Sequence, residues 1–269
     1  MGSLERPFTC QRDGLTIRGR AYFPEGFASD RKYPVVIVSH GFMGNYKSVE
    51  NYCRDFAGIG YVAFGFGFCG GGCTEEDGIK SDGDTTDMTI TTEVADLLAV
   101  KEYVMSQAYA DRGRLVLAGV SQGGFVSGLA AARWGGEVEK LIMIYPALCI
   151  PDHARRGCLG GFAKYDPQNV PERIDCGRTV LGEKFHWDVA DMDPYLELSP
   201  YQGKVLILHG LEDEIVSYSY SVRAKACYGN GQCSLQLIRN MGHGCDETGR
   251  KSIFASIRQF LADRMEVFT

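Results

Sequence analysis

The strongest constraint on the fold is a regular alternation of short apolar runs with longer amphipathic segments. Continuous β-branched or aliphatic runs are typical of strands buried on both faces. Such runs lie at 35–38, 115–118, 141–144 and 205–208. Apolar residues with helical spacing separate them, at 49–59, 94–104, 122–134, 218–227 and 253–261. The alternation predicts an α/β fold whose central sheet is mostly parallel and covered by helices on both faces.

Other segments complete this scheme. Asp13-Gly14 predicts the turn of a hairpin between strands at 8–12 and 15–23, and two further strands are expected at 61–64 and 235–238. Thr92 and Glu93 supply a polar start for the helix around 94–104.

The segment 147–199 interrupts the alternation. It contains no clear strand, and six of the nine prolines fall between Pro146 and Pro200. This density of prolines favours short helices and irregular loops. We therefore expect a single domain over 1–269 in which 147–199 forms an inserted lid, or cap.

Composition excludes several classes of partner. The formal net charge of −6 provides no basic surface for nucleic acid or anionic lipid. No apolar run approaches the roughly 18 residues of a membrane span, and residues 1–7 lack the apolar core of a secretory signal. We expect a cytoplasmic protein that binds no nucleic acid and no membrane. The sequence leaves a homodimer open.

The ten cysteines do not predict a disulfide framework. A chain of 269 residues can build its own core, so reduced thiols are expected. Cys149, for example, lies in an apolar run where a thiol behaves as a small hydrophobe. Cys69 and Cys73 flank three glycines, but no second Cys or His pair completes four ligands. We expect no metal and no cofactor.

The residues Gly119-Val120-Ser121-Gln122-Gly123 match G-x-S-x-G, the nucleophile elbow of serine hydrolases. The motif lies directly between a predicted strand and a predicted helix, which is the context the elbow requires. Its turn is so tight that side chains at 119 and 123 would clash, which explains the glycines. The motif predicts Ser121 as the nucleophile and the backbone N–H of Gln122, at the helix start, as an oxyanion donor.

The general base is found by elimination among five histidines. His40 and His209 each end an apolar strand, and His153 and His186 lie in the inserted segment. Only His243 lies in a loop after the last strand and before the closing helix. We predict His243 as the base and structural roles for the other four.

The orienting acid is expected after a strand that lies between the serine and the histidine in the sequence. Asp213 meets this condition because it closely follows the strand 205–208. Other acidic residues fit less well: two are expected to face solvent, two lie in the insert and one lies three residues past the histidine. They are Glu212, Glu214, Asp191, Asp193 and Asp246.

The second oxyanion donor is expected in the loop after the first long parallel strand, which reads Ser39-His40-Gly41-Phe42-Met43-Gly44. Gly41 allows a close backbone approach, so the N–H of Phe42 is the predicted donor. An ordinary strand-to-helix turn is compatible with the same residues.

Together these residues resemble the α/β-hydrolase superfamily over nearly the whole chain. Segments of the insert, at 150–155, 165–167 and 169–171, are similar to the lid of bacterial cinnamoyl (feruloyl) esterases. The resemblance implies Ser121, Asp213 and His243 as triad, Phe42 and Gln122 as oxyanion donors, and a small-molecule ester as substrate. One departure is the run Gly65-Phe66-Gly67-Phe68-Cys69, where many relatives have a glycine–histidine–glycine loop.

The same resemblance implies hydroxycinnamate (feruloyl) or short-chain acyl esters as substrates. Aromatic side chains near the candidate site can stack on a planar acyl group, although filling the core is the simpler role for each. These are Phe42, Phe66, Phe68, Tyr145, Phe162 and Tyr165. A serine peptidase or amidase and a lipase-like enzyme are the alternatives within the same fold.

Two readings outside this class are less consistent with the sequence. The segment 65–70 matches G-x-G-x-x-G, the dinucleotide-binding pattern, but no helix pattern opens at its third glycine. Gly71, Gly72, Cys73, Thr74 and two acids follow instead. A non-catalytic ligand receptor of the same fold would not need the three predicted triad residues in their expected order.

Overall fold

A computed structural model of the chain describes residues 4–72 and 79–262. Its main sheet has eight strands in the order β1-β2-β4-β3-β5-β6-β9-β10. The hairpin of β1 (Glu5–Arg12) and β2 (Leu15–Tyr22) is antiparallel, and β2 pairs antiparallel with β4 (Val62–Phe66). The other pairs are parallel. They involve β3 (Tyr33–Ser39), β5 (Ala110–Val120), β6 (Lys140–Ile144), β9 (Lys204–Gly210) and β10 (Cys233–Ile238).

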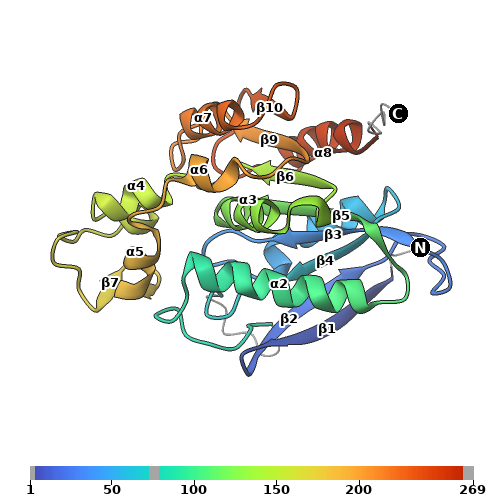
Figure 1. Ribbon diagram of the computed structural model, residues 1–269, viewed down its shortest axis with the longest axis horizontal. Helices are drawn as coiled ribbons and strands as arrows, with labels where there is room; N and C mark the ends of the chain where they lie inside the picture. Colours follow the sequence, from blue (N-terminus) through green and yellow to red (C-terminus); the bar gives the residue numbers. More distant parts are fainter. Residues whose placement is uncertain (1–3, 73–78, 263–269) are drawn as a thin grey trace.

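Helices cover both faces of this sheet, because alternate strand residues pack in opposite directions. In β3, Val36 and Val38 belong to a core with α1 (Glu50–Ala57) and α8 (Glu247–Ala262). Val35 and Ile37 belong to a second core, with α2 (Ile90–Ser106), α3 (Gln122–Trp134) and α7 (Ser219–Cys227). Figure 1 shows α2 and α3 next to each other along the sheet. The predicted α/β class and the mostly parallel sheet are confirmed.

The segment between β6 and β9 projects beyond the sheet, with α4, α5 and β7 at the left of Figure 1. It contains α4 (Ile150–Arg155), η3 (Leu159–Gly161), β7 (Arg173–Asp175), β8 (Val180–Gly182), α5 (Glu183–Val189) and α6 (Pro194–Leu198). The expectation that it has no strand is wrong, since β7 and β8 form a small antiparallel sheet. Each strand has only three residues, and Ile174 opposite Leu181 is the one cross-strand pair in which both side chains are buried. A pattern this short cannot be recognised in the sequence.

Short 3-10 helices complete the chain at η1 (Tyr46–Val49) and η2 (Gly135–Glu137). The described part of the glycine-rich loop after β4 opens no helix, and the next one is α2. Nine cysteines within the described ranges are free thiols, whereas Cys73 and the acids after it lie outside them. None of the described helices has the length and apolarity needed to cross a membrane.

Candidate active site

Ser121 lies in the turn that joins β5 to α3, with φ 54° and ψ −119°. The backbone of a residue other than glycine is strained in this conformation, so the surrounding structure must hold Ser121 there. A Cβ atom on Gly119 would lie 2.1 Å from the carbonyl oxygen of Gly123. A Cβ atom on Gly123 would lie 2.4 Å from the carbonyl oxygen of His40. The two glycines are therefore required by the close packing of this turn, as the sequence predicts.

Two hydrogen bonds link the predicted triad residues. Nε2 of His243 is 2.9 Å from Oγ of Ser121, and Nδ1 of His243 is 2.8 Å from Oδ2 of Asp213. The histidine comes from the loop after β10 and the aspartate from the turn after β9. The structure thus brings together three side chains that are up to 122 positions apart in the sequence.

Asp213 is held in one orientation by N–H donors from Ile215, Val216 and His243, with His209 close by. Oδ1 accepts backbone N–H bonds from Ile215 at 3.0 Å and Val216 at 2.8 Å, and Oδ2 is 3.2 Å from Nε2 of His209. Burial alone would raise the pKa of Asp213, but the bonds with His209, His243 and Val216 outweigh it and hold the pKa well below its usual range. A carboxylate only accepts hydrogen bonds. Nδ1 of His243 must therefore donate, which leaves Nε2 free to accept a proton from Ser121.

The other acidic candidates lie elsewhere. Glu212 accepts the N–H of Met241, so it supports the loop that carries His243. Asp246 accepts the N–H of Gly249 near the start of α8. Neither contact reaches the imidazole.

The remaining histidines fall into two groups. His40 is buried and neutral: burial lowers its pKa to about 4, Nδ1 is 2.7 Å from the carbonyl oxygen of Gly41, and Nε2 accepts the N–H of Phe68. His209 contacts Ser221, and Nδ1 of His186 is 2.9 Å from a tyrosine hydroxyl. His153 differs from the other three because it lines the cavity above Ser121.

The predicted oxyanion residues lie beside Ser121. The loop after β3 approaches it closely, since a Cβ atom on Gly41 would be 3.2 Å from Cβ of Ser121. Phe42 follows in this loop, and Gln122 begins α3. The first N–H groups of a helix have no partner within the helix and carry its positive dipole end. Both residues line the same cavity as Ser121.

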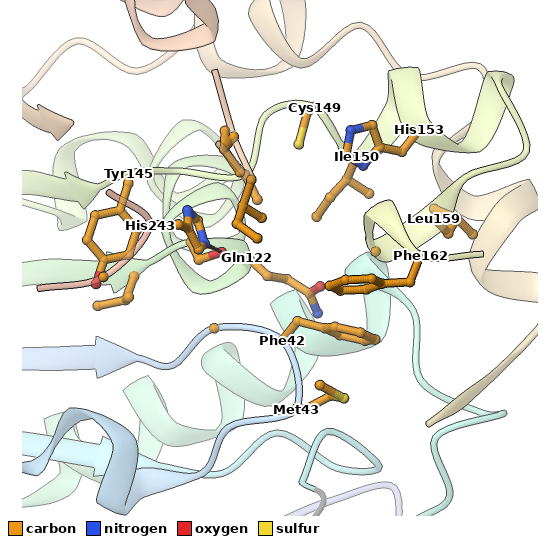
Figure 2. A pocket seen from close by; sticks show the side chains of 18 of the residues that line it. Phe42, Met43, Gln122, Tyr145, Cys149, Ile150, His153, Leu159, Phe162 and His243 are labelled. Atoms are coloured by element: carbon orange, nitrogen blue, oxygen red, sulfur yellow. Dashed lines mark hydrogen bonds between the residues drawn. The ribbon is translucent and has the colours of Figure 1, made fainter. Parts of the chain in front are cut away.

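This cavity has a volume of about 350 Å³ and is lined mainly by apolar side chains from the sheet edge and the insert. In Figure 2 the rings of Phe42 and Phe162 face the same part of it, and the side chain of Gln122 reaches toward them. Of the aromatic residues named from the sequence, Tyr145 also lines the cavity, with its ring 4.9 Å from that of His243. The others are core residues or, for Tyr165, a partner of His186. Phe185 lines the cavity and was not predicted.

Two polar residues at the site were not predicted from the sequence. His153 follows Ile150 by three positions on α4, and both side chains line the cavity. Glu93 is 1% exposed, and both its oxygens are 2.8 Å from Nε2 of Gln122. Glu93 lies four residues before the buried Leu97 and therefore on the same face of α2. This spacing was the available signal that Glu93 is buried and does not face solvent at the start of the helix.

The geometry defines a serine hydrolase of the α/β-hydrolase fold, and comparisons with known proteins agree. The profile of the family described as serine aminopeptidase, S33 (Hydrolase_4) matches residues 30–168, slightly more than half of the chain. The chain belongs to this family. The predicted membership of the α/β-hydrolases is therefore confirmed.

Among solved structures, the chain is similar to Est1E from Butyrivibrio proteoclasticus with ferulic acid bound. The TM-score is 0.84 and the identity 27%, covering 95% of this chain and 100% of Est1E. This agrees with the expected resemblance to feruloyl esterases. Dipeptidyl peptidase 4 of Porphyromonas gingivalis shares the fold, with a TM-score of 0.70 and 17% identity over 98% of this chain and 36% of that one.

A curated relative is the probable chloroplastic glutamyl endopeptidase of Arabidopsis thaliana. It is 23% identical over an alignment of 250 positions that covers 87% of this chain. The chain spans 24% of the length of that protein.

Proposed function

We propose that the chain is a serine carboxylesterase in which Ser121 is the nucleophile, His243 the general base and Asp213 the orienting acid. The observation that carries the proposal is the continuous series of hydrogen bonds from Asp213 through His243 to Ser121 at the wall of a largely apolar cavity. A serine hydroxyl is a weak nucleophile unless an adjacent base takes its proton. The unprotonated Nε2 of His243 is placed to do this.

In the proposed reaction, Oγ of Ser121 attacks the ester carbonyl while its proton passes to His243. The oxyanion of the tetrahedral intermediate accepts bonds from the backbone N–H groups of Phe42 and Gln122, each worth about 3–4 kcal/mol in such sites. His243 then protonates the leaving alcohol, and an acyl-enzyme forms. Water repeats the same steps to release the acid and regenerate Ser121.

The cavity favours a small acyl group. Its volume of about 350 Å³ is near the lower end of ligand pockets, which run from roughly 300 to 1,000 Å³. Phe42 and Phe162 supply aromatic faces for a planar acyl group, and Est1E holds ferulic acid. We therefore propose hydroxycinnamate esters such as methyl ferulate, together with short-chain acyl esters, as substrates. The inserted segment 147–199 acts as a cap that determines acyl selectivity.

A serine peptidase is the second candidate, because the matching family is described as an aminopeptidase and the curated relative as an endopeptidase. An aminopeptidase has to bind a free α-amino group, for which a carboxylate is the usual partner. The residues that line the cavity, as far as the structure describes them, include no Asp or Glu. This favours an ester over a peptide with a free amino end.

A panel of substrates tests the proposal: methyl ferulate, a butyrate ester, a long-chain ester and an amino-acid anilide, each assayed with the wild-type protein and with Ser121→Ala. We expect kcat/KM to be highest for the ferulate or the butyrate, and turnover to disappear in Ser121→Ala. A long-chain optimum would make the protein lipase-like, and a preference for the anilide would make it a peptidase.

A further inference from the structure

Glu93 is a buried carboxyl group next to the active site that the proposed mechanism does not use. It lies in the first turn of α2, below the start of α3, and only 1% of its surface is exposed. Both carboxyl oxygens are 2.8 Å from Nε2 of Gln122. Gln122 is itself 3% exposed, lines the cavity and follows Ser121 directly.

The pairing connects two helix starts at the point where the oxyanion would form. The carbonyl of Ser121 accepts bonds from the N–H groups of Gly124 and Ala147, so one side of the Ser121–Gln122 peptide is already held. Within the described residues, Glu93 is the one hydrogen-bond partner of the Gln122 side chain. Without it, that side chain would lose its fixed orientation in the wall of the cavity, and the first residue of α3 could shift with it.

We propose that Glu93 is a positioning residue, which holds the side chain of Gln122 and thereby aligns the Gln122 backbone N–H with the oxyanion. The inference rests on the proposed function, since it assumes that this N–H is an oxyanion donor. Misplacement of a catalytic group by about 1 Å can cost on the order of a hundredfold in rate. Because the peptide keeps its other bonds, loss of the Glu93 anchor should lower kcat by about tenfold.

Packing alone does not account for a carboxyl group at this place. An apolar side chain of similar length would fill the space without the cost of desolvating a carboxyl. Burial, with Asp96 and Asp188 nearby, raises the pKa of Glu93 well above its usual range despite the bond from Gln122. A neutral glutamine at 93 can accept the same bond, so Glu93→Gln is the conservative variant.

A double-mutant cycle separates positioning from a structural role. Glu93→Met and Gln122→Met each leave a buried polar partner unpaired, which lowers stability, whereas replacing both residues by methionine removes the unpaired groups. The backbone N–H of residue 122 survives in every variant. We expect kcat for a small activated ester to fall about tenfold in both single variants and in the double variant, with KM within about threefold. The midpoint of thermal unfolding should recover in the double variant.

Glu93→Gln should keep kcat within about threefold of wild type. Lys101→Met is the matched control, because Lys101 is a buried residue further along α2 whose partner is Glu137, away from the site. Its kcat should match wild type even if its stability falls.

Recovery of both kcat and thermal stability in the double variant would assign Glu93 a structural role only and overturn the inference, as would a wild-type kcat in folded Glu93→Met. A tenfold loss in Glu93→Gln would exclude the hydrogen-bond anchor. If Ser121→Ala keeps turning over the activated ester, the proposed function itself fails, and this result is independent of Glu93.

Discussion

Changing Asp213 to asparagine tests the proposed triad most directly, because the structure dictates how the new side chain must lie. Oδ1 of Asp213 accepts two backbone N–H groups, from Ile215 and Val216. The carbonyl oxygen of an asparagine has to take this place, since an amide NH2 cannot accept. Its nitrogen then lies at the position of Oδ2, 2.8 Å from Nδ1 of His243.

The consequence is a change of tautomer. A donor opposite Nδ1 forces this atom of His243 to accept, so the ring proton moves to Nε2 and faces Ser121. The imidazole can no longer take the serine proton. We expect kcat to fall about 10⁴-fold, which corresponds to about 5 kcal/mol of transition-state stabilisation.

The assay is steady-state hydrolysis of a short-chain p-nitrophenyl ester, with circular dichroism to verify folding. Asp246→Asn is the matched control, because Asp246 contacts the start of α8 and should keep kcat within about threefold. If Asp213→Asn kept more than a tenth of the wild-type kcat, or if Asp246→Asn were the inactive variant, the assignment of the acid would be wrong.

The triad, the aromatic wall of the cavity and the buried His40 can each be tested separately. Ser121→Ala and His243→Ala should each lower kcat by at least about 10⁴-fold, and the double variant should be hardly worse, because the two act as one unit; additive losses would separate them. Phe162→Ala should lower kcat/KM for methyl ferulate by about 3–10-fold, the value of one aromatic contact, and leave a butyrate ester nearly unchanged; equal losses would argue against stacking. Burial lowers the pKa of His40 to about 4 from 6.5, so the unfolded chain takes up the proton first. The contribution of neutral His40 to the free energy of unfolding should therefore be fully present above pH ~6.5 and should fall by at most about 3 kcal/mol toward pH 4. The difference in urea unfolding between wild type and His40→Gln, followed against pH, measures it.

The parts of the fold that could be predicted are those with local signals. β-branched runs located the strands of the parallel sheet, and the tight turn explained the glycines at 119 and 123, where the structure leaves no room for a Cβ atom. Boundaries were less accurate. The helix expected over 94–104 begins at Ile90, because its start is determined by hydrogen bonds between Thr89 and Thr92 rather than by apolar spacing.

The parts that could not be predicted depend on contacts that are distant in the sequence. The β7–β8 pair packs closely against another segment. The hydroxyl of Thr85 donates to the carbonyl oxygen of Val180, and a Cβ atom on Gly182 would lie 2.2 Å from the carbonyl oxygen of Thr86. Neither contact leaves a pattern within the strands. His153 is similar, because only the path of the insert brings α4 over the cavity.

The same distinction explains why the three proposed triad residues could be predicted from the sequence, whereas Glu93, which holds the neighbouring Gln122, could not. Ser121, Asp213 and His243 each follow a strand of one parallel sheet, and the carboxyl ends of parallel strands meet at a common edge whatever the strand order. Their proximity could therefore be expected without knowing which strands are neighbours. Glu93 reaches the site from a helix on one face of the sheet, and its contact with Gln122 depends on how α2 packs beside α3. Residues of this second kind determine how accurately the reacting groups are held, so substitutions there should change kcat while the Ser121–His243–Asp213 bonds remain intact.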